Sequence, residues 1–345
     1  MQSRILSKLV RVLVFGPPET RQRTMLLAWP PALALLAGLV VPAAVLLPRL
    51  RQGPRCRILV KLGGSACTDK AAFETVHQER LKATARQLAE TRSVSSEENR
   101  VLLHGAGSFG HFHARKYAIK HGSAHEQHSP LGFALTRSSV TRLNGLVVSA
   151  LLEAEQPAVS LHPFPSWRKR RNSPLSGVAM AAEASHAWGA GLLPVLHGDA
   201  VHDEHQGCAV LSGDEIMVEL ARCMRPGLCI FLTDVAGVYD RPPEQPGATL
   251  LSEIRVGRGG ALRVVRDGGA SASESSAEIT TSVAAHDVTG GLAAKLRAAA
   301  AIAARGTPVL IVQAGTAHSA AALAGERPLV GTLLLREGAR WPRYV

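Results

Sequence analysis

From residue 57 onward the sequence predicts an α/β fold with a mainly parallel central sheet. Short apolar runs alternate with longer amphipathic stretches up to residue 312, a pattern typical of βαβ units. Two glycine-rich segments, KLGGS at 61–65 and HGAGSFGH at 104–111, each follow a short apolar run. Each therefore marks a point where a strand ends and a helix begins, and such points bind anions. With 345 residues, of which 46% are apolar, the chain can build a sizeable core.

Residues 1–55 precede this pattern and form a basic, hydrophobic N-terminal extension. The stretch 25–47 is almost wholly apolar, is flanked by arginines and is long enough to cross a bilayer, although three prolines interrupt it. Four interpretations stay open: a membrane anchor, an organelle-targeting leader, a signal peptide, or an extension without a specific role. We expect an anchor or a leader, with possible membrane association through 25–47, ahead of a cytoplasmic catalytic domain at 56–340.

The elements of that domain follow from the pattern in chain order. The predicted strands are 57–62, 100–104, 158–161, 192–197, 228–233 and 308–312. The predicted helices are 73–91, 132–152, 177–188, 213–223 and 291–304. Region 244–287 breaks the alternation with glycine pairs and a low-complexity run, so we expect a mobile insert there. The basic stretch 168–171 is predicted to be a solvated loop.

Charge and composition exclude several classes of protein. The formal net charge is +12, but residues 1–55 hold eight lysines and arginines against one glutamate, which leaves +5 for the rest. Aromatic residues make up only 4%, without the aromatic-basic interleaving of single-strand binders, so we expect no nucleic-acid partner. The five cysteines form no CxxC pair and are odd in number, which indicates neither a zinc site nor a disulfide framework.

The placement of lysines around the glycine turns indicates phosphoryl transfer. This reaction needs its two oxygens aligned and the charge on the phosphoryl oxygens neutralised, so lysines and backbone amides suffice. Lys61 ends the first strand just before Gly63, Gly64 and Ser65, where its ammonium can lie over the phosphates that those amides hold. Lys70 follows in TDK, and DVTGG at 287–291 opens a helix that carries Lys295 one turn inside. No GxxxxGK[ST] segment exists, which disfavours the P-loop fold.

One histidine and two aspartates complete the candidate site. His111 closes the second glycine loop, where an imidazole could donate a hydrogen bond to a phosphate on the acceptor. From spacing alone it could equally be a surface histidine. Asp214, in LSGDE, opens a helix, and Asp234, in LTDVAGVYD, follows a strand. Each could simply cap a helix or turn; alternatively Asp214 orients the lysines and Asp234 approaches the nucleotide or its Mg²⁺.

Taken in order, KLGGS, HGAGSFGH, HGD at 197–199, LSGDE, LTDVAGVYD and DVTGG resemble the amino acid kinase superfamily. Within it the sequence is most similar to the isopentenyl phosphate kinase family, because TDK follows the first loop and a histidine closes GSFGH. The resemblance covers about 57–335. It implies an open αβα sandwich, ATP and Mg²⁺, a small-molecule substrate, conversion of isopentenyl phosphate to its diphosphate in isoprenoid synthesis, and a homodimer.

The resemblance also implies roles for individual residues. Lys61, Lys70 and His111 would be catalytic, and no protein metal ligand set is expected. The residues implied to bind the nucleotide are Lys61, Gly63, Gly64, Ser65, Gly107, Asp234, Gly291 and Lys295. The residues implied to hold the acceptor are Ala106, His111, Gly213 and Asp214. An apolar tail would need a pocket, for which the sequence offers Phe133, Leu135, Val140 and Leu143, although these residues could equally be core.

The sequence departs from the family pattern in a few places, and two rival functions stay open. Ala106 replaces a glycine common in the second loop, and Ala236 stands where the superfamily often has Asp or Asn. The first rival is a kinase for carbamate, an acylamino acid or a nucleoside monophosphate; a carboxylate substrate would want a fixed arginine, whereas His111 favours a phosphate. The second rival is a non-catalytic nucleotide sensor on the same fold, against which the joint presence of the three lysines argues.

Overall fold

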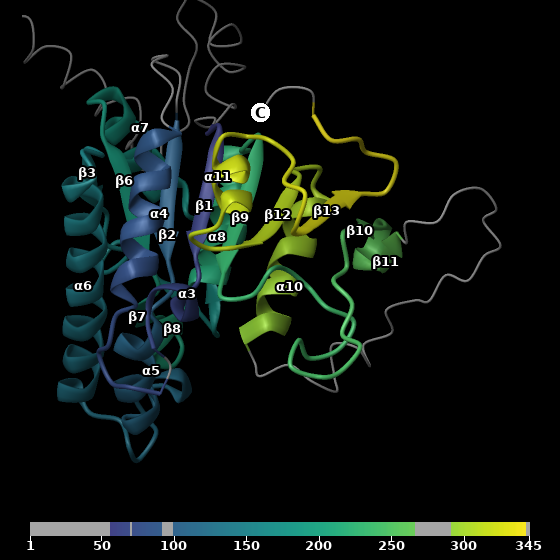
Figure 1. Cartoon of the computed structure of the whole chain (residues 1–345). Helices are drawn as coiled ribbons and strands as arrows, with labels where there is room; N and C mark the ends of the chain where they lie inside the picture. Colours follow the sequence, from purple (N-terminus) through teal and green to yellow (C-terminus); the bar gives the residue numbers. More distant parts are fainter. Residues whose placement is uncertain (1–55, 70, 92–98, 266–290, 343–345) are drawn as a thin grey trace, which may run out of the picture. The chain divides into compact units, whose positions relative to one another are not determined.

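The computed structural model describes residues 56–69, 71–91, 99–265 and 291–342 (Figure 1). The predicted anchor or leader in 1–55 lies outside the described residues, as do Lys70 and the low-complexity run 270–277. Among the described residues, no helix combines the length and the apolar character needed to span a membrane.

A large central sheet forms the framework of the described chain. Its strand order is β11-β10-β13-β12-β9-β1-β2-β6-β3, and all neighbours are parallel except β10–β11 and β12–β13. Every residue of β1 is buried, as expected for a central strand of a parallel sheet that is covered on both faces. The strands are β1 (Ile58–Leu62), β2 (Arg100–His104), β3 (Ala158–Ser160), β6 (Leu193–His197), β9 (Leu228–Thr233), β10 (Glu253–Val256), β11 (Leu262–Val265), β12 (Val309–Gln313) and β13 (Thr332–Arg336).

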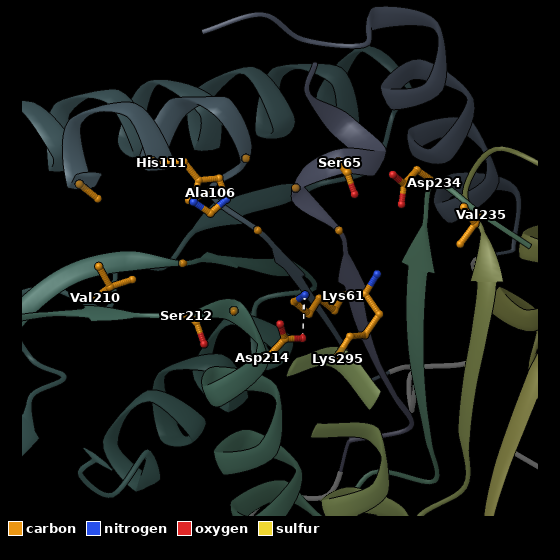
Figure 2. Close-up of a pocket in the computed structure, with 18 of the residues that line it drawn as sticks. Lys61, Ser65, Ala106, His111, Val210, Ser212, Asp214, Asp234, Val235 and Lys295 are labelled. Carbon is orange, nitrogen blue, oxygen red and sulfur yellow. Dashed lines mark ion pairs between the residues drawn. The ribbon is translucent and has the colours of Figure 1, made fainter. Parts of the chain in front are cut away.

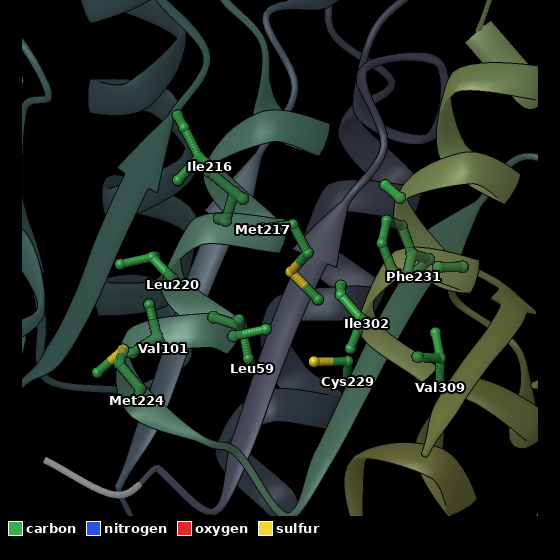
Figure 3. Close-up of a cluster of buried hydrophobic side chains, with 14 of the residues drawn as sticks. Leu59, Val101, Ile216, Met217, Leu220, Met224, Cys229, Phe231, Ile302 and Val309 are labelled. Carbon is green, nitrogen blue, oxygen red and sulfur yellow. The ribbon is translucent and has the colours of Figure 1, made fainter. Parts of the chain in front are cut away.

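Helices cover both faces of this sheet, so the αβα sandwich is confirmed. On one face Leu59, Cys229 and Phe231 pack against the apolar sides of α8 (Gly213–Met224) and α10 (Gly291–Ala304) (Figure 3). On the other face alternate residues of β1, such as Val60, pack with α4 (Gln78–Glu90) and α6 (Pro130–Glu153). The other α-helices of the described residues are α3 (Gly64–Cys67), α5 (Gly107–Lys116), α7 (Val178–Gly189) and α11 (Ala317–Leu323).

A small second sheet lies beside the carboxyl end of β6. Its order is β5-β4-β7-β8, with strands β4 (Lys169–Arg170), β5 (Ser173–Pro174), β7 (Asp199–Asp203) and β8 (Gly207–Leu211). Strand β7 begins two residues after β6 ends, and β8 leads directly into α8. This sheet therefore connects the edge of the central sheet to the start of α8.

All six predicted strands and all five predicted helices are present. The helix predicted over 73–91 begins only at Gln78, because the chain forms turns before it, and the other elements agree with their predicted bounds within two residues. Two expectations are corrected. The insert predicted over 244–287 is not a loop throughout, because residues 253–256 and 262–265 pair as an antiparallel hairpin at the edge of the main sheet. The glycines at 259 and 260, with φ of 84° and 89°, form its turn. The stretch 168–171 is not wholly solvated, because Lys169 is buried.

Candidate active site

The candidate site is a cavity of about 450 Å³ at the carboxyl edge of the central sheet (Figure 2). The segments that follow β1, β2, β6 and β9 all contribute to its wall, because four neighbouring parallel strands end at this edge. The predicted site residues among its lining are Lys61, Gly63, Gly64, Ser65, Ala106, Gly107, His111, Gly213, Asp214, Asp234 and Lys295. Gly291 is the first residue of α10, and Lys70 lies outside the described residues.

The two glycine loops touch each other backbone to backbone. A Cβ on Gly64 would lie 2.7 Å from the backbone nitrogen of Gly107, and one on Gly105 would lie 2.6 Å from that of Gly64. Gly107 also has a φ of +50°, which strains other residues. Both loops must therefore lack side chains at Gly64, Gly105 and Gly107, and the two glycine turns lie in direct backbone contact.

Thr68 fastens the two loops together. Its hydroxyl donates to the carbonyl of Gly64 at 2.8 Å and accepts from the backbone N–H of Ser108 at 3.0 Å. The side chain is fully buried, so both bonds are shielded from water. The first residue of the TDK segment thus has a structural contact to the second glycine loop, which the sequence analysis did not assign.

Lys61 and Asp214 form an ion pair at the floor of the cavity. The Nζ of Lys61 lies 2.9 Å from Oδ1 of Asp214, and the lysine side chain is only 6% exposed (Figure 2). The same ammonium lies 5.6 Å from the centroid of the Phe231 ring. Gly213 leaves room for the lysine, since a Cβ there would lie 3.0 Å from its Cε. The pair fixes one positive charge between the first glycine loop and the start of α8, and of the two roles considered for Asp214 this contact favours the orientation of a lysine.

The start of α8 is held in place by a capping box. The hydroxyl of Ser212 accepts from the backbone N–H of Glu215, and the Glu215 carboxylate accepts from the backbone N–H of Ser212 at 2.8 Å. The other Glu215 oxygen lies 2.7 Å from the buried Nζ of Lys169, which also donates to the carbonyl of Val210. Lys169 thus ties the second sheet to this helix N-terminus.

Asp234 and Lys295 line the opposite wall from the second glycine loop (Figure 2). Asp234 follows the last residue of β9, and its backbone carbonyl accepts from the side chain of Gln313 at 3.1 Å. Lys295 is the fifth residue of α10 and is 7% exposed. Lys61 and Lys295 therefore bring two ammonium groups to one cavity, from strand and helix respectively.

His111 lies in the second turn of α5, one turn beyond Ala106, and lines the cavity from the side of the second glycine loop (Figure 2). Small and apolar side chains continue the wall from there, namely Ala114, Val140 and Val210. Of the four residues considered for an apolar pocket or for the core, Val140 lines this cavity, and Phe133, Leu135 and Leu143 do not. Leu143 is part of the core, while Phe133 packs on the rings of Phe164 and His202.

Sequence reasoning missed two further features of the cavity. Asp199, the last residue of HGD, lines it and accepts a two-pronged ion pair from Arg137 of α6, with N–O distances of 3.0 and 3.1 Å. The Asp199 side chain is fully buried. His104 and His197 end strands β2 and β6 below the same loops. A histidine at the end of an apolar strand, directly before a glycine, was the sequence signal that could have identified each of them.

The family model described as the amino acid kinase family matches residues 57–313, well over half of the sequence. Together with the αβα sandwich and the paired glycine loops, this match shows that the chain belongs to the amino acid kinase family.

Individual relatives narrow this class. The isopentenyl phosphate kinase of Arabidopsis thaliana is 38% identical over 306 residues, which cover 78% of this chain and 91% of that protein. The isopentenyl phosphate kinase of Methanothermobacter thermautotrophicus is 33% identical, with 74% and 91% covered. A solved isopentenyl phosphate kinase structure is 28% identical, with a TM-score of 0.63 and 80% and 99% covered. Within the amino acid kinase family the chain is thus a member of the isopentenyl phosphate kinase branch.

Proposed function

We propose that this protein transfers the γ-phosphoryl group of ATP to isopentenyl phosphate, forming isopentenyl diphosphate and ADP for isoprenoid synthesis. The observation that carries the proposal is the convergence of Lys61, Lys295 and His111 on one cavity, around two glycine loops in backbone contact. The reaction requires two phosphate groups side by side. Two adjoining anion-binding loops meet that requirement.

We divide the cavity into two sides. The nucleotide side comprises Lys61, Gly63, Gly64, Ser65, Gly107, Asp234 and Lys295, with Gly291 at the start of α10. The acceptor side comprises Ala106, His111 and Gly213, with Asp214 holding Lys61 between the two. Lys70 would neutralise charge on the transferring phosphoryl group, since it follows Thr68 and Asp69 in the sequence and Thr68 donates a hydrogen bond to Gly64 of the first loop.

The transfer itself needs no general base. An oxygen of the acceptor phosphate attacks the γ-phosphorus, the bond from that phosphorus to the ADP oxygen breaks, and ADP leaves with the electron pair. A phosphate monoester has a second pKa of about 6 and is already a dianion near pH 7. The protein therefore has to align the two groups and neutralise their charges, for which lysine ammonium groups, an imidazole and backbone amides are sufficient.

A magnesium ion would fit the nucleotide side. Among the described residues, no cluster of three or more histidine, cysteine or acidic side chains could hold a metal. Mg²⁺ in kinases is commonly held by one or two carboxylates together with substrate phosphates, so a dedicated cage is not required. Asp234, whose position beside the carboxyl end of β9 lines the nucleotide side, would hold the ion. When bound, Mg²⁺ would supply additional positive charge to the ATP phosphates.

Three expectations about the whole protein stay predictions. The first is a homodimer, which would involve a second copy of the chain. The other two are membrane association through 25–47 and an anchor or targeting leader in 1–55 ahead of a cytoplasmic domain, and both concern residues outside the described ranges. Size-exclusion chromatography with light scattering would test the dimer. A comparison of the full chain with a chain starting at residue 56 in a membrane-fractionation experiment would test the anchor.

The proposed function is tested by a panel of acceptors. Purified protein with ATP and Mg²⁺ is supplied separately with isopentenyl phosphate, dimethylallyl phosphate, carbamate, acetylglutamate and UMP, and ADP release is followed. We expect turnover with the first two, isopentenyl phosphate being used at the highest kcat/KM. Turnover of one of the other three acceptors without the first two would replace the proposal by that activity, and ATP binding without any turnover would favour a sensor.

A further inference from the structure

Two buried histidines lie side by side beneath the acceptor side. His104 is the last residue of β2 and His197 the last of β6, and the two residues are partners in the parallel register. Their rings stack with centroids 5.8 Å apart, and both side chains are fully buried. Neither lines the cavity, although the residues after them, Gly105 and Gly198, both do. They are therefore positioned to act on the loops and not on a ligand.

Each ring holds the carbonyl of the residue that follows it. The Nδ1 of His104 lies 3.0 Å from the oxygen of Gly105, and the Nδ1 of His197 lies 3.0 Å from the oxygen of Gly198. A carbonyl oxygen can only accept, so both Nδ1 atoms carry the proton. The segments that follow β2 and β6 are also joined directly, because the N–H of Gly198 donates to the carbonyl of His104 at 3.0 Å.

The outer nitrogen of each ring is satisfied by a partner that suits this tautomer. The Nε2 of His104 lies 3.1 Å from the side-chain nitrogen of Asn144, whose oxygen accepts from the hydroxyl of Ser160. The Nε2 of His197 lies 2.9 Å from the Nδ1 of His162. Burial lowers the pKa of His104 to about 3 and lowers that of His197 as well, so both rings are neutral near pH 7. A neutral ring with one donor and one acceptor matches both of its partners.

We propose that His104 and His197 are positioning residues that set the orientation of the peptide groups in the acceptor side, with Asn144, Ser160 and His162 fixing their tautomer. The proposal rests on the proposed function, since it assigns these residues to the binding of the acceptor phosphate.

The physical link is the planarity of the peptide bond. In a trans peptide the carbonyl and the following N–H point in opposite directions. A Gly105 carbonyl held toward His104 therefore turns the N–H of Ala106 away from that ring. This N–H donates to no other described residue, and Ala106 lines the cavity. The histidine thus keeps one donor available for an anion without the flexibility that two flanking glycines would otherwise allow.

Steady-state kinetics on two variants of one residue test this role. His104→Leu removes the hydrogen bond to Gly105, whereas His104→Asn keeps an N–H donor near the position of Nδ1. We expect His104→Leu to raise KM for isopentenyl phosphate about tenfold or more, while KM for ATP changes less than about twofold. His104→Asn should recover most of the loss. The control is His186→Leu on the exposed face of α7, which should change neither constant.

Equal increases in both KM values, or no increase in either, would overturn the proposal. If His104→Leu does not fold, measurement of the histidine tautomers in the wild-type protein tests the proposal instead. A two-bond ¹H–¹⁵N correlation spectrum of the wild-type protein should show His104 and His197 protonated at Nδ1 alone, and protonation at Nε2 would overturn it. Lack of turnover of isopentenyl phosphate by the wild-type protein would refute the proposed function, whereas the tautomer measurement does not depend on turnover.

Discussion

The nucleotide side and the acceptor side that we propose for the cavity are built from different groups. On the nucleotide side, charge comes from side chains, because Lys61, Asp234 and Lys295 reach the cavity from two strand ends and a helix. On the acceptor side, the wall around Ala106 and Gly213 is mostly backbone, His111 adds an imidazole to it, and His104 and His197 lie beneath it. Activity should therefore depend mainly on charged side chains on the nucleotide side, and mainly on the position of the backbone on the acceptor side.

Removal of Lys61 should have the largest effect and tests the nucleotide side. Lys61→Met removes a positive charge next to the transferring group, so we expect kcat to fall by about 10²–10³-fold. It also leaves the carboxylate of Asp214 without its partner, at a cost of roughly 3–5 kcal/mol in the free energy of unfolding. Steady-state kinetics measure the fall in kcat, and chemical denaturation measures the loss in the free energy of unfolding.

The double variant Lys61→Met/Asp214→Asn is the matched control. It should regain most of the stability, because no uncompensated carboxylate is left, but none of the activity. Recovery of activity in the double variant would show that the lysine acts only through the stability of the fold, and would contradict its role on the nucleotide side.

Gly64→Ala should have the next largest effect and tests the contact between the two sides. The added Cβ would lie 2.7 Å from the backbone nitrogen of Gly107, so one loop has to move. A displacement of about 1 Å can cost about 10²-fold in rate, and forced overpacking costs roughly 1–3 kcal/mol. We expect both KM values to rise, since both loops shift.

Gly145→Ala in α6 is the control for that substitution. No atom lies within 4 Å of the added Cβ, so the change should stabilise the helix by up to about 1 kcal/mol and leave the kinetics unaltered. A Gly64→Ala variant with wild-type kinetics would mean that the two loops are not locked together as the structure indicates.

His111→Ala should have a smaller and one-sided effect. The imidazole lines the acceptor side from α5, and a hydrogen bond to a charged group contributes about 1.5–3 kcal/mol. We expect KM for isopentenyl phosphate to rise at least about tenfold, while the Kd for ATP measured by calorimetry is unchanged. Equal weakening of both ligands would remove the distinction between the two sides at this residue.

The smallest predicted effect is a pH dependence of stability from the acceptor side. Burial, and secondarily the neighbouring His197, lowers the pKa of His104 from 6.5 to about 3. Below pH 6.5 the unfolded chain takes up a proton that the folded state does not, so this contribution to stability is complete above 6.5 and is lost as the pH falls toward 3. We expect a loss of about 2 kcal/mol at pH 5 from this ring. The free energy of unfolding in urea should fall between pH 7 and pH 5 by about 2 kcal/mol more in the wild type than in His104→Asn. The same pH dependence in both proteins would argue against a buried neutral ring.

The central sheet and most of the cavity wall were predictable from the sequence because their signals are local. Apolar runs such as that of β9 mark strands, and glycines that directly follow β1 and β2 mark the loops. The small second sheet was not predictable, since β4 consists of Lys169 and Arg170, and a basic dipeptide indicates solvent exposure. Lys169 is nevertheless buried, because Glu215, 46 residues away in the sequence, compensates its charge.

The same limit applies to the histidines beneath the acceptor side. His104 and His197 are 93 positions apart in numbering and meet only because β2 and β6 are neighbours in the sheet. Their tautomer depends on Asn144 and His162, which come from other elements. A long-range network of this kind is determined by strand order, which local patterns in the sequence do not specify.

The most direct test of phosphoryl transfer between the two sides is identification of the new bond by ³¹P NMR. The wild-type protein is incubated with ATP, Mg²⁺ and isopentenyl phosphate, and a sample without protein serves as the control. Transfer as proposed consumes the single phosphorus resonance of the monophosphate and produces ADP and a pair of mutually coupled resonances from the new P–O–P linkage. Hydrolysis of ATP to ADP and inorganic phosphate with the monophosphate resonance unchanged would contradict it.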